Sequence, residues 1–147
     1  MIILILGGHG FIGHNVTRQL LDLGHNVHVV DCHNDYGEYP KVEFDTVMKQ
    51  RVDHIGDHAI WFGDVTNADF MERVFKEVRP DRVIDLATYP NAKMVKKNVV
   101  DATINMIAAT ALALELCTRY EVQRFVLASS SMVYGDFDRF NTHPNEQ

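Results

Sequence analysis

The sequence predicts an α/β fold in which helices cover both faces of a single parallel sheet. Five short apolar runs rich in β-branched residues alternate with longer segments that have helical spacing. The short runs are almost continuously apolar, as expected for parallel strands that are buried on both faces. Alternating strands and helices build a parallel sheet through right-handed crossovers. We therefore expect one doubly wound domain over residues 1–147.

The predicted elements follow each other in strict alternation. Strands are expected over Ile2–Leu6, Asn26–Asp31, Ala59–Phe62, Arg82–Ala87 and Arg124–Ala128. Apolar residues at helical spacing predict helices over Phe11–Leu23, Ala68–Val78 and about 98–120, and a further short helix around Phe44–Val52. The polar segment Gly135–Gln147 is expected to be a loop, so the sheet is expected to be incomplete at its C-terminal side.

Composition and charge narrow the class of protein. Hydrophobic residues make up 46% and charged residues 23%, which is ordinary for a globular domain. The net charge of −6 argues against a nucleic-acid partner, which needs clustered Lys and Arg. The apolar start Met1–Leu6 is much shorter than the twenty or so residues of a membrane span and lacks the features of a signal peptide. We expect a cytoplasmic protein with no membrane partner.

Cysteine and histidine spacing does not predict a metal site. Cys32 and Cys117 lie far apart and are expected to be reduced thiols. His54 and His58 are four residues apart, but Gly56 lies between them and no acidic or cysteine partner has ligand spacing.

A glycine-rich turn, GGHGFIG, lies between the first strand and the first helix. In this context Gly7 allows a sharp turn, Gly10 allows the backbone to approach a pyrophosphate, and Gly13 allows the helix to pack closely on the strand. The helix N-terminus offers free N–H groups and a partial positive charge to phosphates. We expect Gly7, Gly10, Phe11, Ile12 and Gly13 to contact a dinucleotide; the alternative is a tight turn without a ligand.

Asp31 ends the second strand, where a carboxylate can accept hydrogen bonds from the hydroxyls of an adenosine ribose. It would repel a 2′-phosphate, and no Arg or Lys follows until Lys41. The sequence therefore favours NAD over NADP as the cofactor of a Rossmann-type domain. The alternative is an exposed Asp at a strand end, without a ligand.

Five segments together resemble the extended short-chain dehydrogenase/reductases, in the NAD-dependent epimerase/dehydratase family. GGHGFIG has the family's glycine spacing, Gly63–Thr66 resembles its G-D-[VIL] turn, and Val83–Ala87 its fourth strand. Asn105–Ala109 resembles its N-x-x-G-[TA] segment, with Ala108 in place of Gly, and Ala128–Gly135 its S-S-x-x-V-Y-G run. The resemblance covers the whole chain. It implies that Asp64, Val65, Leu86, Ala87 and Asn105 also contact NAD.

The last of these segments carries the position that matches the family's catalytic Ser/Thr. Counting back from the V-Y-G triplet places it at Ser130, with Ser129 and Ser131 as the alternatives. The family's general acid/base is the Tyr of a later Tyr-x-x-x-Lys motif, which does not occur after Ser130 in these 147 residues. Tyr89 and Lys93 fit that motif by letter, but they precede Ser130 and no sustained helical run is predicted around them. The chain alone is therefore expected to be inactive.

The resemblance implies an enzyme that acts on nucleotide sugars. In the family's 4,6-dehydratases an Asp-Glu pair follows the catalytic residue, whereas this chain has Ser131 and Met132, and methionine cannot exchange a proton. This leaves epimerisation at C4 through a transient keto sugar as the predicted reaction. Asn34–Tyr36, Lys49 and Arg51 are loosely similar to the uronate 4-epimerases. A reductase or dehydrogenase of the same family and a non-catalytic NAD-binding module are the other readings.

Three features remain open at this level. The long helix has a wide apolar face, which is either a core face or, as the resemblance implies for a complete protein of the family, part of a homodimer interface. His9 is expected either to donate to a phosphate oxygen or to be a solvated loop residue. Asp85 stands in an apolar strand, where its carboxylate is either hydrogen-bonded to loop backbone or raised in pKa by burial; no function is predicted for it.

Overall fold

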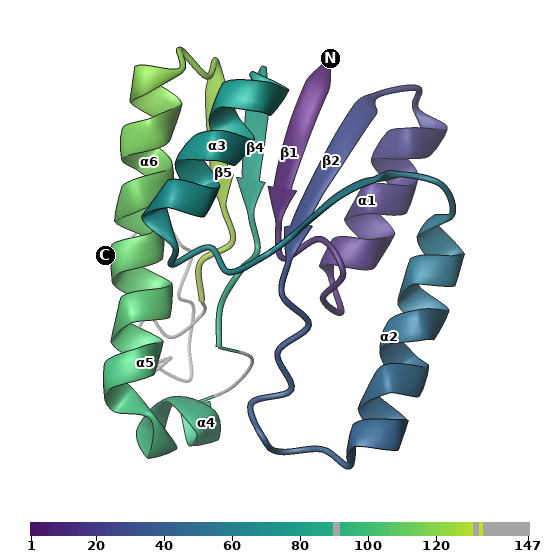
Figure 1. The fold of residues 1–147 in the computed structure, drawn as a ribbon, viewed down its shortest axis with the longest axis vertical. Coiled ribbons are helices and arrows are strands. Elements are labelled where there is room, and N and C mark those ends of the chain that lie inside the picture. The colour runs from purple at the N-terminus through teal and green to yellow at the C-terminus, as the bar shows by residue number, and fades with distance from the viewer. Residues whose placement is uncertain (90–91, 131–132, 134–147) are drawn as a thin grey trace, which may run out of the picture.

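The computed structural model describes residues 1–89, 92–130 and 133. Five parallel strands form one sheet in the order β3-β2-β1-β4-β5. Figure 1 labels four of them, β2, β1, β4 and β5. The strands are β1 (Ile2–Leu6), β2 (Asn26–Asp31), β3 (Ala59–Phe62), β4 (Arg82–Asp85) and β5 (Arg124–Leu127). The first three have the predicted bounds. β4 ends two residues and β5 one residue earlier than predicted.

Helices connect the strands, as the alternating pattern predicts. They are α1 (Gly13–Asp22), α2 (Lys41–Ile55), α3 (Ala68–Val78), α4 (Ala92–Lys97), α5 (Val99–Thr103), the π-helix η1 (Ile104–Ala108) and α6 (Ala109–Arg119). α2 is longer than predicted, because it starts directly after Pro40 and stops only at Gly56, whose φ is +78°. The prediction that no helix forms around Tyr89 and Lys93 was wrong, because α4 begins at Ala92. Lys96 and Lys97 lie in the last turn of α4, where positive charges are favourable.

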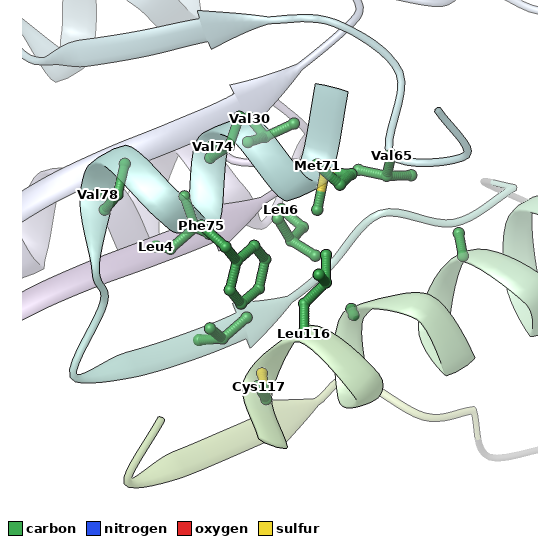
Figure 2. Close-up of a cluster of buried hydrophobic side chains, with 13 residues drawn as sticks. Leu4, Leu6, Val30, Val65, Met71, Val74, Phe75, Val78, Leu116 and Cys117 are labelled. Atoms are coloured by element: carbon green, nitrogen blue, oxygen red, sulfur yellow. The ribbon is translucent and has the colours of Figure 1, made fainter. Parts of the chain in front are cut away.

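The larger part of the core lies between one face of the sheet and helices α3 and α6. Phe75 of α3 and Leu116 of α6 are fully or almost fully buried against Leu4, Leu6 and Val83 (Figure 2). α3 shows why the sequence forms a helix here: Asn67 caps it by accepting the N–H of Phe70, and Met71, Val74, Phe75 and Val78 repeat at helical spacing. Burial of these side chains anchors the central strands.

The opposite face is covered by α1, with α2 beside it (Figure 1). Val16, Leu20 and Leu21 of α1 pack on Ile3, Ile5 and Val27 of the sheet. Helices on both faces make the sheet doubly wound, as predicted.

The point where the chain reverses its direction across the sheet positions the site. β1 pairs with β2 on one side and with β4 on the other, so Leu6 lies opposite both Val30 and Asp85. The turn after β1 is therefore flanked by the loops after β2 and β4. In doubly wound sheets, ligands bind at this carboxyl-end crevice.

The run Val99–Arg119 is long and apolar enough to cross a membrane, by length and composition alone. Its residues Ala109, Ala113, Leu116 and Cys117 are buried in the core described above. We therefore interpret it as a helix of the α/β domain with one face on the sheet and the other face exposed.

Candidate functional site

A cavity of about 560 Å³ opens at the carboxyl ends of β1, β2 and β4. Eight of the predicted site residues line it: Gly7, Gly10, Phe11, Asp31, Val65, Leu86, Ala87 and Asn105. They come from five separate segments of the chain, and only the fold brings them together.

The glycine turn after β1 is packed against its neighbours as tightly as the sequence predicts. Gly7 has φ +76°, and a Cβ there would lie 2.9 Å from the backbone nitrogen of Ala87. A Cβ on Gly13 would lie 2.2 Å from the carbonyl oxygen of Gly7. Gly10 differs, because a Cβ there would meet only the Gly7 oxygen, at 3.1 Å, among the described residues, and Gly10 lines the cavity. Gly7 and Gly13 are thus required by the fold, whereas Gly10 leaves room for a ligand.

The start of α1 offers positive potential to this cavity. Among the described residues no side chain caps the helix at Ile12, and its first turn holds no acidic residue. Arg51 of α2 lies against the same turn: one guanidinium nitrogen is 3.4 Å from the carbonyl oxygen of His9, and the group stands 6.0 Å from the centre of the Phe11 ring. Helix dipole and guanidinium together favour an anion here.

Asp31 holds two loops in place from the end of β2. Its Oδ2 accepts the backbone N–H of His9 at 2.9 Å, and its Oδ1 accepts that of His33 at 2.9 Å. The carboxylate therefore fixes the glycine turn relative to the loop after β2. Each oxygen has a further lone pair that can accept a ribose hydroxyl.

His9 is completely buried, so the solvated alternative for this residue was wrong. Its two ring nitrogens contact the Nε2 atoms of His33 and His58, both at 2.7 Å. Burial is the main cause that lowers the His9 pKa to about 4; the neighbouring histidines also lower it and Asp31 opposes them. His54 instead packs its ring on His14.

Asn105 supplies an acceptor without a partner among the described residues. It lies in the π-helix η1 and lines the cavity, and its side-chain Oδ1 is buried and makes no hydrogen bond. Buried polar atoms are nearly always paired, and π-helical segments inside α-helices are frequent at functional sites. This orphan oxygen indicates that a bound molecule with a donor completes the site.

Helix α2 and the loop before it form the wall that the sequence did not assign to the site. Tyr36, Phe44, Met48 and Arg51 line the cavity from this side. The Tyr36 ring lies 4.4 Å from the Tyr89 ring, and burial is the main cause that raises the Tyr36 pKa to about 12, which keeps the phenol protonated. The similarity of Asn34–Tyr36 and Arg51 to the uronate epimerases was the available signal for this wall.

Four predicted site residues do not line the cavity. Ile12 is exposed and Gly13 is buried at the start of α1. Asp64 lines a neighbouring polar pocket with Cys32 and Lys41, and its Oδ1 accepts the N–H of Thr66. Ser130 is exposed just after β5, and its carbonyl accepts the N–H of Val133. Ser131 and Met132 lie outside the described residues.

Both readings of Asp85 hold at once. Its Oδ1 accepts the N–H of Ala87 at 3.1 Å, and its Oδ2 accepts the Thr110 hydroxyl at 3.3 Å. Burial, the largest influence, raises the Asp85 pKa, while these two bonds oppose the rise. The carboxylate therefore ties the end of β4 to α6.

The sequence of this chain matches the model of the NAD dependent epimerase/dehydratase family over residues 3–147. The chain belongs to this family. Its strand order and its glycine turn agree with that membership.

Relatives and solved structures match most of this chain. Protein CapI of Staphylococcus aureus is 31% identical over 137 residues, which are 92% of this chain and 39% of CapI. UDP-glucose 4-epimerase of Neisseria meningitidis serogroup C is 30% identical over 139 residues, covering 91% of this chain and 38% of that enzyme. The structure of Bifidobacterium longum UDP-glucose 4-epimerase in complex with NAD⁺ and UDP superposes with a TM-score of 0.73 at 28% identity, over 92% of this chain and 38% of that one. This chain thus spans about two fifths of the length of these relatives.

Proposed function

We propose that this chain binds NAD in the cavity at the carboxyl ends of β1, β2 and β4, as the cofactor-binding part of a nucleotide-sugar 4-epimerase. The observation that carries the proposal is the buried Oδ1 of Asn105, which has no partner in the part of the chain that the structure describes; Asn105 lines the same cavity as Gly10. A dinucleotide fits both features, because its pyrophosphate needs close backbone approach and its sugars carry hydroxyl donors.

The residues present suit the parts of NAD. The glycine turn, the start of α1 and Arg51 would hold the pyrophosphate. Asp31 would accept from the ribose hydroxyls and exclude a 2′-phosphate. Val65, Leu86 and Ala87 provide apolar surface for flat rings. The relative from Bifidobacterium longum holds NAD⁺ and UDP, which supports the same pairing of cofactor and substrate class here.

The chemistry that NAD supplies in such a site is reversible acceptance of a hydride from a sugar carbon. Ser130, at the carboxyl end of β5, is the residue of this chain proposed to hydrogen-bond the reacting sugar oxygen. We propose that turnover also requires a Tyr-x-x-x-Lys pair, which the 147 residues do not contain after Ser130. By this proposal the chain alone binds the cofactor without turnover.

The exposed apolar face of α5, η1 and α6 supports a proposed homodimer. Val100 is 72% and Ile107 65% exposed, and Val99, Ile104 and Leu114 continue the face. Exposed apolar patches of this kind mark interaction surfaces. We propose a cytoplasmic protein in which two copies pair through this face. Sedimentation of wild type and Ile107→Glu tests the pairing: a wild-type monomer at tens of micromolar would refute it.

The binding proposal is tested by titration calorimetry with NAD, NADP and UDP-glucose. We expect NAD to bind at least tenfold more tightly than NADP, because Asp31 repels the 2′-phosphate. Equal affinity for the two cofactors would contradict the role of Asp31, and no binding of either would refute the proposed function.

Turnover is tested by following interconversion of UDP-glucose and UDP-galactose. We expect a polypeptide that continues through a Tyr-x-x-x-Lys pair to equilibrate the two sugars with no net change in NADH absorbance. Net production of NADH would favour a dehydrogenase instead. Epimerisation by the 147-residue chain alone would contradict the requirement for the later pair.

A further inference from the structure

Three histidines from three loops form a continuous row beneath the glycine turn. His9 Nδ1 lies 2.7 Å from His33 Nε2, and His9 Nε2 lies 2.7 Å from His58 Nε2. His58 Nδ1 in turn lies 2.7 Å from the carbonyl oxygen of Gly56. These are hydrogen-bond distances between different pairs of atoms, so the three rings do not converge on one point as metal ligands do.

The carbonyl at one end sets the direction of every bond in the row. A carbonyl oxygen only accepts, so His58 Nδ1 carries a hydrogen. In neutral His58 the Nε2 then has a lone pair and accepts from His9 Nε2–H. Neutral His9 accordingly accepts at Nδ1 from His33 Nε2–H. With all three rings neutral, every bond of the row is made.

The row can take up one extra proton without losing a bond. A proton added at His33 Nδ1 leaves all three contacts intact. If His33 then passes its Nε2 proton to His9 Nδ1, and His9 passes its Nε2 proton to His58 Nε2, the charge appears on His58. The two contacts between rings are then kept with their directions reversed, and His58 Nδ1 still donates to the Gly56 carbonyl. A second proton has no such place, because His33 and His58 would both have to donate to a ring that has one lone pair.

Several charged groups surround the row, among them Asp35, Lys41, Asp45 and Asp64, which line a polar pocket together with His33. Asp31 accepts the backbone N–H of both His9 and His33, and Arg51 contacts the His9 carbonyl. Arg18 of α1 lies near the other end, donating to the Ile55 carbonyl beside Gly56. Phe62 packs edge-on against the His33 ring, and burial disfavours a charge on His9 itself. The extra proton therefore belongs to the two ends of the row, and the His33 end lines the cavity.

We propose that His33, His9 and His58 form a one-proton relay, and that binding of a dinucleotide pyrophosphate at the glycine turn is coupled to uptake of that proton. The coupling rests on the proposed NAD site, whereas the relay does not. A pyrophosphate brings negative charge to the turn that His9 belongs to, and a positive row stabilises it. When the relay is charged, the bound state is favoured; the gain is present at low pH and is lost as pH rises.

Nitrogen-detected NMR of the histidine rings of the 147-residue chain tests the relay without a ligand. We expect Nδ1–H on His58 and Nε2–H on His9 and His33 at pH 8, and uptake of one proton shared by the row on acidification. His33→Gln should shift the titration of His58, although the His33 ring does not contact the His58 ring. His25→Gln, at the opposite end of the strands, is the matched control and should shift none of the three.

The relay would be overturned if His33 and His58 each took up a full proton and the replacement of one did not change the titration of the other. If His9→Gln does not fold, His33→Gln and His58→Gln still test the relay, because His33 and His58 are only half-buried.

Calorimetry with NAD in two buffers of different ionisation enthalpy tests the coupling. We expect uptake of up to about one proton, and a Kd that falls at most about tenfold per pH unit on acidification. His58→Gln, which lies outside the cavity, should reduce that uptake. NAD binding with no proton uptake and one Kd at pH 6 and 8 would overturn the coupling and leave the proposed function standing. No NAD binding at any pH would refute the proposed function, and the ring titrations would still decide the relay.

Discussion

Replacement of Gly13 by alanine should break the turn that positions the whole site. The added Cβ would lie 2.2 Å from the Gly7 oxygen and 2.8 Å from the carbonyl carbon and Cα of Gly8. All three are backbone atoms, so the start of α1 must move away from the turn by roughly 1 Å to restore ordinary contact. Overpacking typically costs about 1–3 kcal/mol, and the better helix propensity of alanine returns about 1 kcal/mol. Because all three contacts are with backbone, the upper end of this range applies, and we expect a net loss of about 2 kcal/mol in the free energy of unfolding.

Gly10→Ala is the matched control, because it adds the same methyl group three residues earlier. Among the described residues its Cβ would meet only the Gly7 oxygen, at 3.1 Å, and Gly10 lines the cavity. We expect its free energy of unfolding to stay within about 1 kcal/mol of wild type while NAD affinity falls at least tenfold. Urea unfolding followed by Trp61 fluorescence, together with NAD calorimetry, measures both quantities.

The pair separates the fold from the ligand. Gly13→Ala with wild-type stability would refute the reading of close backbone packing. Gly10→Ala with wild-type NAD affinity would refute the placement of the pyrophosphate on this turn.

Three further predictions concern single groups of the site. The His9 pKa of about 4 lies below the reference value of 6.5. Neutral His9 therefore contributes about 3 kcal/mol to the free energy of unfolding above pH 6.5, and this contribution is lost as pH falls toward 4. Urea unfolding that gives the same free energy of unfolding at pH 7.5 and at pH 4.5 would contradict this. Asn105→Ala should leave the free energy of unfolding unchanged or raise it, because it removes a buried acceptor that has no partner among the described residues. The same substitution should weaken NAD binding about tenfold. Unchanged NAD affinity by calorimetry would show that Asn105 is not part of the site. Asp31→Asn should lower the free energy of unfolding by about 1.5–3 kcal/mol, since an amide oxygen can replace only one of the two carboxylate acceptors. It should also reduce the preference for NAD over NADP. Wild-type stability together with the wild-type cofactor preference would refute both roles of Asp31.

The sequence predicted the parts of the site that depend on local backbone. Gly7 and Gly13 could be recognised because a strand, a tight turn and a helix in succession leave little room for side chains, and the structure shows that room is absent. Asp31 could be recognised because a strand end fixes where its side chain lies. The wall made by α2 was largely missed, since a helix of mixed polarity after an irregular loop gives no clear periodic signal.

The histidine row shows most clearly what could not be read from the chain. His9, His33 and His58 are 24 and 25 residues apart, and spacing along the chain gave no reason to connect them. His9 was expected either to donate to a phosphate oxygen or to be a solvated loop residue, but its ring lies between that of His33, in the loop after β2, and that of His58, in the loop before β3.

By itself the sequence determined the five strands, the doubly wound class and the glycine turn. Hydrophobic periodicity and the steric limits on backbone conformation both depend on only a few neighbouring residues. The tertiary structure alone decided which polar atoms meet. Asp31 holds two loops, Asn105 Oδ1 has no partner among the described residues, and three imidazoles lie in a row at hydrogen-bond distance. Such contacts depend on strand order and on helix placement to within about 1 Å, since a hydrogen bond weakens steeply with distance and angle.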